Sequence, residues 1–190
     1  MTQKLVREYY SAIGVKEWRR LVRDPYHMLE FDTSIHFIKK HSPMAGLVLD
    51  AGGGPGRYTI ELAKLGYDVV LLDLTPELLE IAKKQIKKAR VGDRVKRILQ
   101  GSIDNLSIFD DNTFDIVLCL GGALAHIIDV KQREKAIDEL IRVAKKNAPI
   151  FVSVIGKFAT LICALIYWPK DLEINGLYHE IYDTGDYFGD

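Results

Sequence analysis

The stretch LVLDAGGGPGRY, residues 47–58, decides the fold. Residues 47–51 are apolar apart from Asp50 and predict a buried strand, and the glycines at positions 52, 53, 54 and 56 predict a turn that opens a helix. A turn that passes close beneath a ligand excludes Cβ atoms, and some of its positions need a positive φ, so glycine is the residue that fits. The sequence therefore predicts a strand, a glycine-rich loop and a helix with a ligand above the loop.

Beyond this loop, short apolar runs alternate with amphipathic helical segments. This alternation is typical of repeated βα units, in which helices cover both faces of a parallel sheet. The predicted strands are residues 47–51, 68–73, 95–100, 114–120 and 149–155, and the predicted helices are residues 58–65, 76–89, 131–145 and 158–167. Residues 1–45 are expected to be helical, with breaks at Gly14, Asp24 and Pro25. The fold class is therefore α/β.

The composition is that of an ordinary globular domain without an electrostatic bias. The chain has 190 residues, and its 26 Lys and Arg balance 26 Asp and Glu, so nothing favours nucleic acid or an anionic membrane as a partner. No signal peptide or membrane-spanning segment is expected, which favours the cytoplasm. Cys119 and Cys163 both lie in apolar runs, where we expect them to be buried, and no metal site is predicted.

Three further groups of residues follow predicted strands. Asp73 ends the second strand, where a carboxylate can hold the two hydroxyls of a ribose. Ser102, Ile103 and Asp104 follow the third strand, where the carboxylate can accept a hydrogen bond from an adenine amino group while Ile103 covers the ring. Small residues from Gly121 onward follow the fourth strand. Because the carboxyl ends of parallel strands share one edge of the sheet, we expect these groups to form one site.

The glycine loop does not match the fingerprint of dinucleotide-binding proteins. The pattern G-x-G-x-x-G requires a third glycine, but counting from Gly52 gives Arg57 and counting from Gly54 gives Thr59. An NAD-dependent dehydrogenase is therefore the less favoured alternative for this site.

From about Gly46 to Ile155 the four features, in this order, resemble the class I S-adenosylmethionine-dependent methyltransferases. The similarity is to the small-molecule members of the ubiquinone/menaquinone-biosynthesis type. It implies a Rossmann-like, doubly wound, mostly parallel sheet and S-adenosylmethionine as cofactor, with S-adenosylhomocysteine as product. By this resemblance the cofactor-binding residues would be Asp50, Ala51, Gly52, Gly53, Gly54, Gly56, Asp73, Leu74, Ser102, Ile103, Asp104, Leu120 and Gly121.

The resemblance also sets expectations for the two ends of the chain. Residues 1–45 would form an N-terminal helical cap, in which Tyr10, Trp18 and Arg20 could close over the cofactor as a lid, and residues 46–190 would form the cofactor-binding domain. Members of the family usually add two more strands after the fifth, and no pattern for strands six and seven follows here. We therefore expect a domain that is incomplete at its C-terminal end. The sequence leaves open whether the chain is a piece of a longer protein or a genuinely shortened member of the family.

A small molecule is the expected methyl acceptor, and the sequence does not identify it or the atom methylated. The fourth strand is followed by L-G-G-A-L-A-H rather than the N-P-P-Y-like motif of nucleobase amino-methylation. His126, in this segment, is the best-placed general base. A protein that holds the cofactor or its product without catalysis, for example as a partner subunit, remains an alternative. Whether the chain forms a homodimer is left open.

Overall fold

The computed structural model describes residues 3–23, 25–167, 169–170 and 179. The chain divides into two compact units, one ending at Ser153 and the other beginning at Val154. The first unit contains the sheet and its covering helices. In the second, the described helix is α6 (Lys157–Tyr167).

The sheet of the first unit is parallel throughout, as the alternating pattern predicts. Its strand order is β3-β2-β1-β4-β5. The strands are β1 (Leu47–Ala51), β2 (Asp68–Asp73), β3 (Val95–Gln100), β4 (Ile116–Cys119) and β5 (Ile150–Val152). In the register of the central strands Asp50 lies beside Leu71 of β2 and Leu118 of β4. The carboxyl ends of the central strands therefore meet at one edge.

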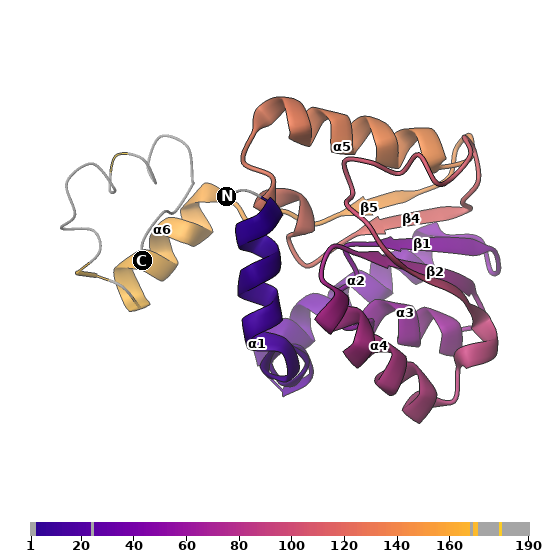
Figure 1. The fold of residues 1–190 in the computed structure, drawn as a ribbon, viewed down its shortest axis with the longest axis horizontal. Coiled ribbons are helices and arrows are strands. Elements are labelled where there is room, and N and C mark those ends of the chain that lie inside the picture. The colour runs from indigo at the N-terminus through magenta and orange to yellow at the C-terminus, as the bar shows by residue number, and fades with distance from the viewer. Residues whose placement is uncertain (1–2, 24, 168, 171–178, 180–190) are drawn as a thin grey trace. The chain divides into compact units, whose positions relative to one another are not determined.

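Helices cover both faces of the sheet (Figure 1). On one side lies α5 (Val130–Val143), and on the other lie α2 (Pro25–His41), α3 (Arg57–Lys64) and α4 (Pro76–Ala89). Two short 3₁₀ turns, η1 (Gly92–Arg94) and η2 (Ala123–His126), lead into β3 and follow β4. The first helix, α1 (Gln3–Arg23), stands across the carboxyl ends of the strands. It is interrupted at Gly14, whose φ of 31° and ψ of −109° are not helical, as the sequence predicts for this position.

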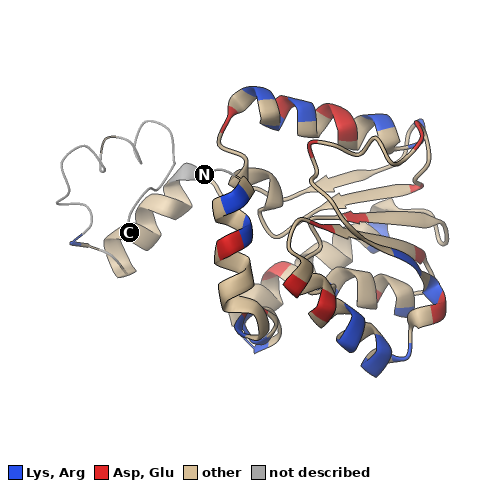
Figure 2. Ribbon diagram, viewed as in Figure 1, with Lys and Arg blue, Asp and Glu red and all other residues tan. Residues whose placement is uncertain are grey.

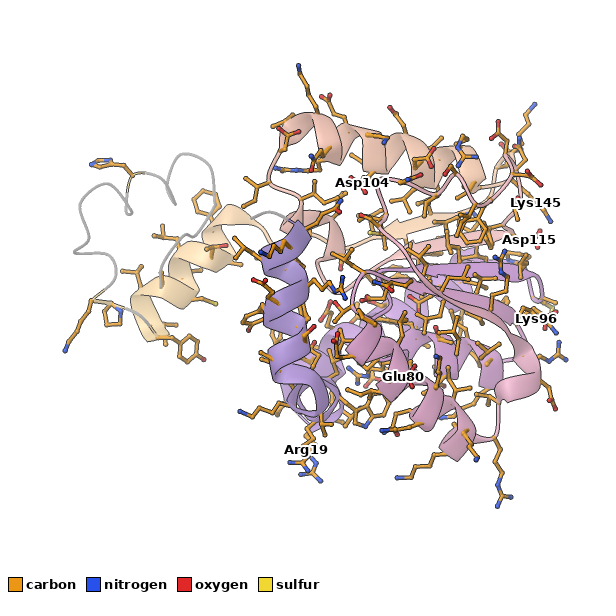
Figure 3. The ribbon with its side chains drawn as sticks, in the orientation of Figure 1. Arg19, Glu80, Lys96, Asp104, Asp115 and Lys145 are labelled. Atoms are coloured by element: carbon orange, nitrogen blue, oxygen red, sulfur yellow. The ribbon has the colours of Figure 1, made fainter. Side chains whose placement is uncertain are left out.

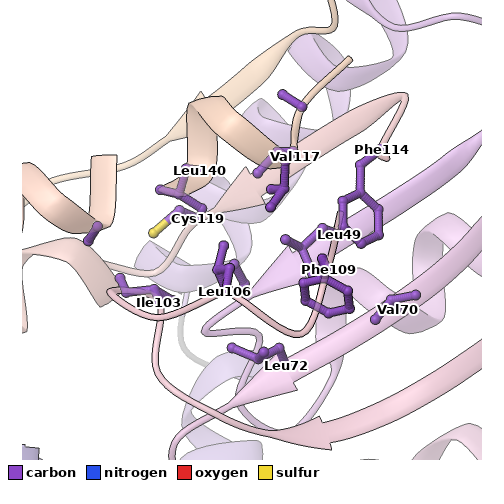
Figure 4. Close-up of a cluster of buried hydrophobic side chains, with 14 of the residues drawn as sticks. Leu49, Val70, Leu72, Ile103, Leu106, Phe109, Phe114, Val117, Cys119 and Leu140 are labelled. Atoms are coloured by element: carbon purple, nitrogen blue, oxygen red, sulfur yellow. The ribbon is translucent and has the colours of Figure 1, made fainter. Parts of the chain in front are cut away.

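The largest buried cluster fills the space between α5 and the sheet (Figure 4). Leu49, Val117 and Leu140 belong to it, and the rings of Phe109 and Phe114 meet edge to face with their centroids 5.0 Å apart. A second cluster, which includes Ile38, Val48 and Leu62, fills the opposite side. Because both faces of the central strands are covered, their sequences are continuously apolar rather than alternating.

Three expectations need correction. The strands predicted at residues 114–120 and 149–155 are shorter. β4 is Ile116–Cys119, the residues that pair with β1 and β5, and β5 is Ile150–Val152, just before the second unit begins at Val154. Phe114 pairs with Ala144 in an isolated bridge instead. Cys119 is buried as predicted, but Cys163 is exposed, because α6 buries Ala164 and leaves most of its other apolar side chains open.

Charged residues fall mostly on the helices and the loops, and the strands carry few of them (Figure 2). At the amino end of the sheet Lys145 pairs with Asp115 at 2.7 Å, a contact that lies far from α1 (Figure 3). Within the described part of the chain no helix is both long and apolar enough to cross a bilayer.

The aromatic pair in the main core gives a direct test of the packing. Replacing Phe114, which is fully buried, by alanine removes its contact with Phe109 and leaves a cavity, so we expect a loss of about 3–5 kcal/mol in the free energy of unfolding. Urea denaturation followed by circular dichroism measures it. Ile108→Ala, at an exposed position nearby, should change stability little. Equal effects for the two variants would contradict the assignment of this core.

Candidate functional site

The carboxylate at the end of β1 is engaged within the glycine-rich loop. Asp50 is buried, and its Oδ2 accepts hydrogen bonds from the hydroxyl of Thr59 at 2.6 Å and from the Thr59 backbone N–H at 3.0 Å. Burial raises the pKa of Asp50 to about 6, against the opposing effect of the two bonds from Thr59. Asp50 thus fixes the first turn of α3 to the end of β1. The carboxylate lies beneath the loop, and the loop presents its backbone on the opposite side, where a ligand would bind.

The loop lies so close to this carboxylate that side chains are excluded from it. A Cβ atom on Gly53 would come within 2.5 Å of Cγ of Asp50. Such a contact does not occur between real Cβ atoms and their neighbours, so any larger residue there would displace the acid or the loop. Glycine is required at this position by the Asp50 carboxylate and Leu71 beneath the loop, whereas the closeness to a ligand expected from the sequence stays a prediction.

Asp73, at the end of β2, joins two turns. One carboxylate oxygen accepts the backbone N–H of Gly54 at 2.8 Å, and the other accepts that of Thr75, also at 2.8 Å. Burial raises the pKa of Asp73, while the N–H donors of Thr75 and Gly54 work in the opposite direction. The Thr75 side chain also hydrogen-bonds this carboxylate. Since each carboxylate oxygen has two acceptor sites, these three bonds leave capacity for a further donor, such as a ribose hydroxyl.

The segment after β3 brings a third carboxylate to the same edge. Ile103 is buried in the main core, and Asp104 keeps 9% of its surface exposed. The side-chain amide of Gln3, from the first turn of α1, donates to both carboxylate oxygens of Asp104, at 3.1 and 3.0 Å, and to the hydroxyl of Ser102 at 3.1 Å. The position of Asp104 at this edge is visible in Figure 3. Sequence reasoning did not identify Gln3, because no local pattern links residues about a hundred positions apart.

The segment after β4 supplies open space and a histidine. Gly121 has a φ of 69°, and a Cβ atom there would meet nothing within 4 Å, while the adjoining Leu120 is buried. His126, at the end of η2, shares a hydrogen bond of 2.8 Å with the hydroxyl of Tyr10 from α1. Burial lowers the pKa of His126 and raises that of Tyr10, so both side chains are held in their neutral forms.

The three proposed lid residues occupy different environments. Tyr10 reaches the site through His126. Trp18 packs against the apolar cluster formed by α3, α4 and β2. Arg20 makes a two-point ion pair with the buried carboxylate of Glu17, with N–O distances of 2.8 and 2.6 Å, and also contacts His27. Glu17 is a further residue that the sequence did not single out, since a carboxylate on a charged helix ordinarily faces solvent.

These contacts define a class of protein. Three carboxylates, a glycine turn and an open glycine position gather at the carboxyl ends of adjacent parallel strands, where proteins with open α/β sheets bind their ligands. The carboxylate of Asp73 suits the hydroxyls of a ribose, and that of Asp104 suits the amino group of a base. Ile103, beside Asp104, belongs to the main core. In the described residues no cluster of three or more His, Cys, Asp or Glu could hold a metal ion. The chain is thus an α/β protein whose candidate ligand site lies at the carboxyl ends of its strands.

Comparison with known proteins identifies the family. The methyltransferase domain family matches residues 48–147, which is more than half of the chain. The chain is 35% identical over 142 residues to a glycine/sarcosine N-methyltransferase of Parasynechococcus marenigrum, covering 74% of this chain and 49% of that protein. It is 32% identical over 125 residues to a ubiquinone/menaquinone biosynthesis C-methyltransferase of Zymomonas mobilis, covering 60% of this chain and 45% of that protein.

Solved structures agree with this result. One is the structure of an S-adenosylmethionine-dependent methyltransferase from Methanosarcina mazei, which is 26% identical to this chain. The two structures superpose with a TM-score of 0.59, and the match covers 73% of this chain and 66% of the other. The chain belongs to the methyltransferase domain family, and to its class I, S-adenosylmethionine-dependent branch. It spans about half the length of the curated relatives that it matches.

The buried carboxylate of Asp50 predicts an unusual dependence of stability on pH. Its folded-state pKa of about 6 lies above the ordinary value of 3.8, so its contribution to stability is complete below pH 4 and is lost as the pH rises to 6. For a pKa shift of this size the free energy of unfolding falls by about 3 kcal/mol over this pH range. Urea denaturation between pH 4 and 7 measures this change. The free energy of unfolding of the parent protein should fall relative to that of Asp50→Asn as the pH rises.

Asp115→Asn is the matched control for this titration. The hydrogen bond from Lys145 holds the pKa of Asp115 below its usual range, so its contribution is lost as the pH falls rather than as it rises. If the profile of Asp50→Asn ran parallel to that of the parent protein from pH 4 to 7, the carboxylate would not have the raised pKa described here.

Proposed function

We propose that this chain is the cofactor-binding part of a methyltransferase that moves the methyl group of S-adenosylmethionine to a small molecule. The observation that carries the proposal is the meeting of Asp73, the glycine turn and Asp104 at one edge of a parallel sheet. The cofactor supplies a methyl group activated on a sulfonium. We place the protein in the cytoplasm, since its two cysteines provide no disulfide framework.

The roles of the residues follow from their positions. Asp73 would accept the ribose hydroxyls through its remaining acceptor sites, with Leu74 beside the adenine. Asp104 and Ser102 would receive the adenine amino group while Ile103 lies against the ring. The backbone of residues 50–56 would lie beneath the methionine part, and Gly121 and Leu120 would border the methyl group, where the open space above Gly121 leaves room for an acceptor.

The Tyr10–His126 pair lies where an acceptor proton could be removed. Methyl transfer is an in-line displacement governed by positioning and by exclusion of water, and a base is needed only when the acceptor is protonated. A neutral imidazole can take that proton. Because Nε2 of His126 is bonded to the hydroxyl of Tyr10, the proton reaches it through Tyr10 or after this bond is released.

An amine is the acceptor class to test first. The relative from Parasynechococcus marenigrum is named for N-methylation of glycine and sarcosine, whereas that from Zymomonas mobilis is named for C-methylation in quinone biosynthesis. An ammonium group must lose a proton before it attacks a methyl group, and His126 offers a place for that proton. Phenols are the second class, since their hydroxyl proton needs the same base.

Binding of the product nucleoside tests the cofactor site. Isothermal titration should give micromolar binding of S-adenosylhomocysteine to the parent protein and none of NADH. Asp73→Asn, which removes the negative charge beside the ribose, should weaken binding at least tenfold, while Asp93→Asn on the exposed turn η1 should leave it unchanged. Binding of NADH, or equal affinities of the two variants for the nucleoside, would overturn the assignment.

Turnover tests catalysis separately from binding. With radiolabelled S-adenosylmethionine and panels of primary amines, secondary amines and phenols, His126→Gln should bind the cofactor normally and lose most methyl transfer. We expect the loss to be about 10²–10⁴-fold for an acceptor that needs general base catalysis. Tight cofactor binding without methyl transfer to any member of the panels by the parent protein would favour the non-catalytic binding protein instead.

A further inference from the structure

The first turn of α1 makes a contact that the family assignment leaves unexplained. Gln3 is on the solvent side of the site, yet its amide nitrogen lies 3.1 and 3.0 Å from the two carboxylate oxygens of Asp104 and 3.1 Å from the hydroxyl of Ser102. With Gln3 in place Asp104 keeps only 9% of its surface exposed, so this amide is part of what covers the carboxylate.

The group that Gln3 presents is chemically equivalent to the amino group of adenine. Both are planar NH₂ groups on an sp² carbon, with two N–H donors and no acceptor on the nitrogen. The nitrogen of Gln3 is almost equally distant from both oxygens of Asp104, so it lies along the direction from which a single donor approaches them together. A second NH₂ group cannot enter along that direction while Gln3 is there, because the two nitrogens would collide.

We propose that Gln3 sets the affinity of the protein for its nucleoside cofactor by competing with the adenine amino group for Asp104 and Ser102. The inference rests on the proposed function, since it requires adenine to bind at this carboxylate. The cofactor then binds fully only after the first turn of α1 has released Asp104, and the energy of the Gln3 contacts is subtracted from the energy of cofactor binding.

The construction of α1 allows this release. Gly14 breaks the helix, and beyond it Glu17 is buried and Trp18 packs into an apolar cluster, which anchors the second half. In the first half Leu5 and Tyr9 are more than half exposed, and Tyr10 is the large side chain that packs inward, against His126.

Polar contacts supply the attachments of that first half. They are the bonds of Gln3, the Tyr10–His126 bond and a bond of 2.7 Å from the hydroxyl of Ser11 to Glu77 on α4. The bonds from Gln3 to Ser102 and from Ser11 to Glu77 are exposed, whereas those to Asp104 and His126 are partly buried. A segment held largely by hydrogen bonds opens at lower cost than one anchored in an apolar core. The break at Gly14 is the point about which residues 3–13 can move.

A substitution that removes the side-chain amide while keeping the length of the side chain tests the competition. Gln3→Met keeps the length and helix propensity of the side chain, and we expect it to bind S-adenosylhomocysteine about five- to tenfold more tightly than the parent protein in isothermal titration. Lys4→Ala is the matched control, because the Lys4 side chain is 83% exposed one position further along. It should leave the affinity unchanged. In an Asp104→Ala background the gain from Gln3→Met should disappear, since the contested acceptor is gone.

Hydrogen exchange gives a second, independent measurement on the parent protein. Amides of residues 3–13 should exchange faster when S-adenosylhomocysteine is bound, while those of residues 15–23 should not. Unchanged or weaker binding by Gln3→Met, or slower exchange of residues 3–13 in the complex, would overturn the competition. If neither the parent protein nor Gln3→Met binds the nucleoside, the proposed function itself fails, and this outcome is distinct from binding that Gln3→Met leaves unaltered.

Discussion

The buried carboxylate of Asp73 joins the turn after β1 to the turn after β2, and the geometry of the site depends on it. By accepting the N–H groups of Gly54 and Thr75 it fixes the glycine loop over the end of the sheet and sets the start of α4. Hydrogen bonds to a charged group contribute about 1.5–3 kcal/mol each, enough to offset much of the cost of burying the acid. Asp50 does the same for α3 through Thr59. Two acids thus hold the loop from below, and the backbone it presents can remain rigid while a ligand binds.

The same edge is covered by a helix whose contacts there are polar. Tyr10 meets His126, and Gln3 meets Asp104, while the apolar packing of α1 is concentrated beyond Gly14. This division has a chemical advantage. Methyl transfer from a sulfonium gains from a site without water, which calls for a cover, whereas exchange of product for fresh cofactor calls for a cover that opens. With hydrogen bonds before Gly14 and apolar packing after it, the proposed release of the first half of α1 would meet both demands within one helix.

Much of the fold could be predicted from the sequence, because apolar periods and capping residues are local signals. The five strands and the helices of the first unit fall where these signals place them, and Pro76 begins α4 as expected. The ends of β4 and β5 were predicted too long, since apolar residues continue past the point where the chain leaves the sheet. The assigned roles of Asp73 and Asp104 remain predictions, although the structure brings both to one edge. Gln3 and Glu17 could not be foreseen, because what marks them is a contact or a burial that exists only after α1 has docked.

The central claim is that one nucleoside site spans the ends of β1, β2, β3 and β4, and amide NMR tests it most directly. Titrating the ¹⁵N-labelled chain with S-adenosylhomocysteine should shift the resonances of Gly54, Thr75, Asp104 and Gly121, and all four should saturate at one ligand concentration. Saturation of all four amides at one ligand concentration indicates that the four loops respond to a single binding event. Shifts confined to one of these loops, or found instead at the far end of α4 and at η1, would contradict the account.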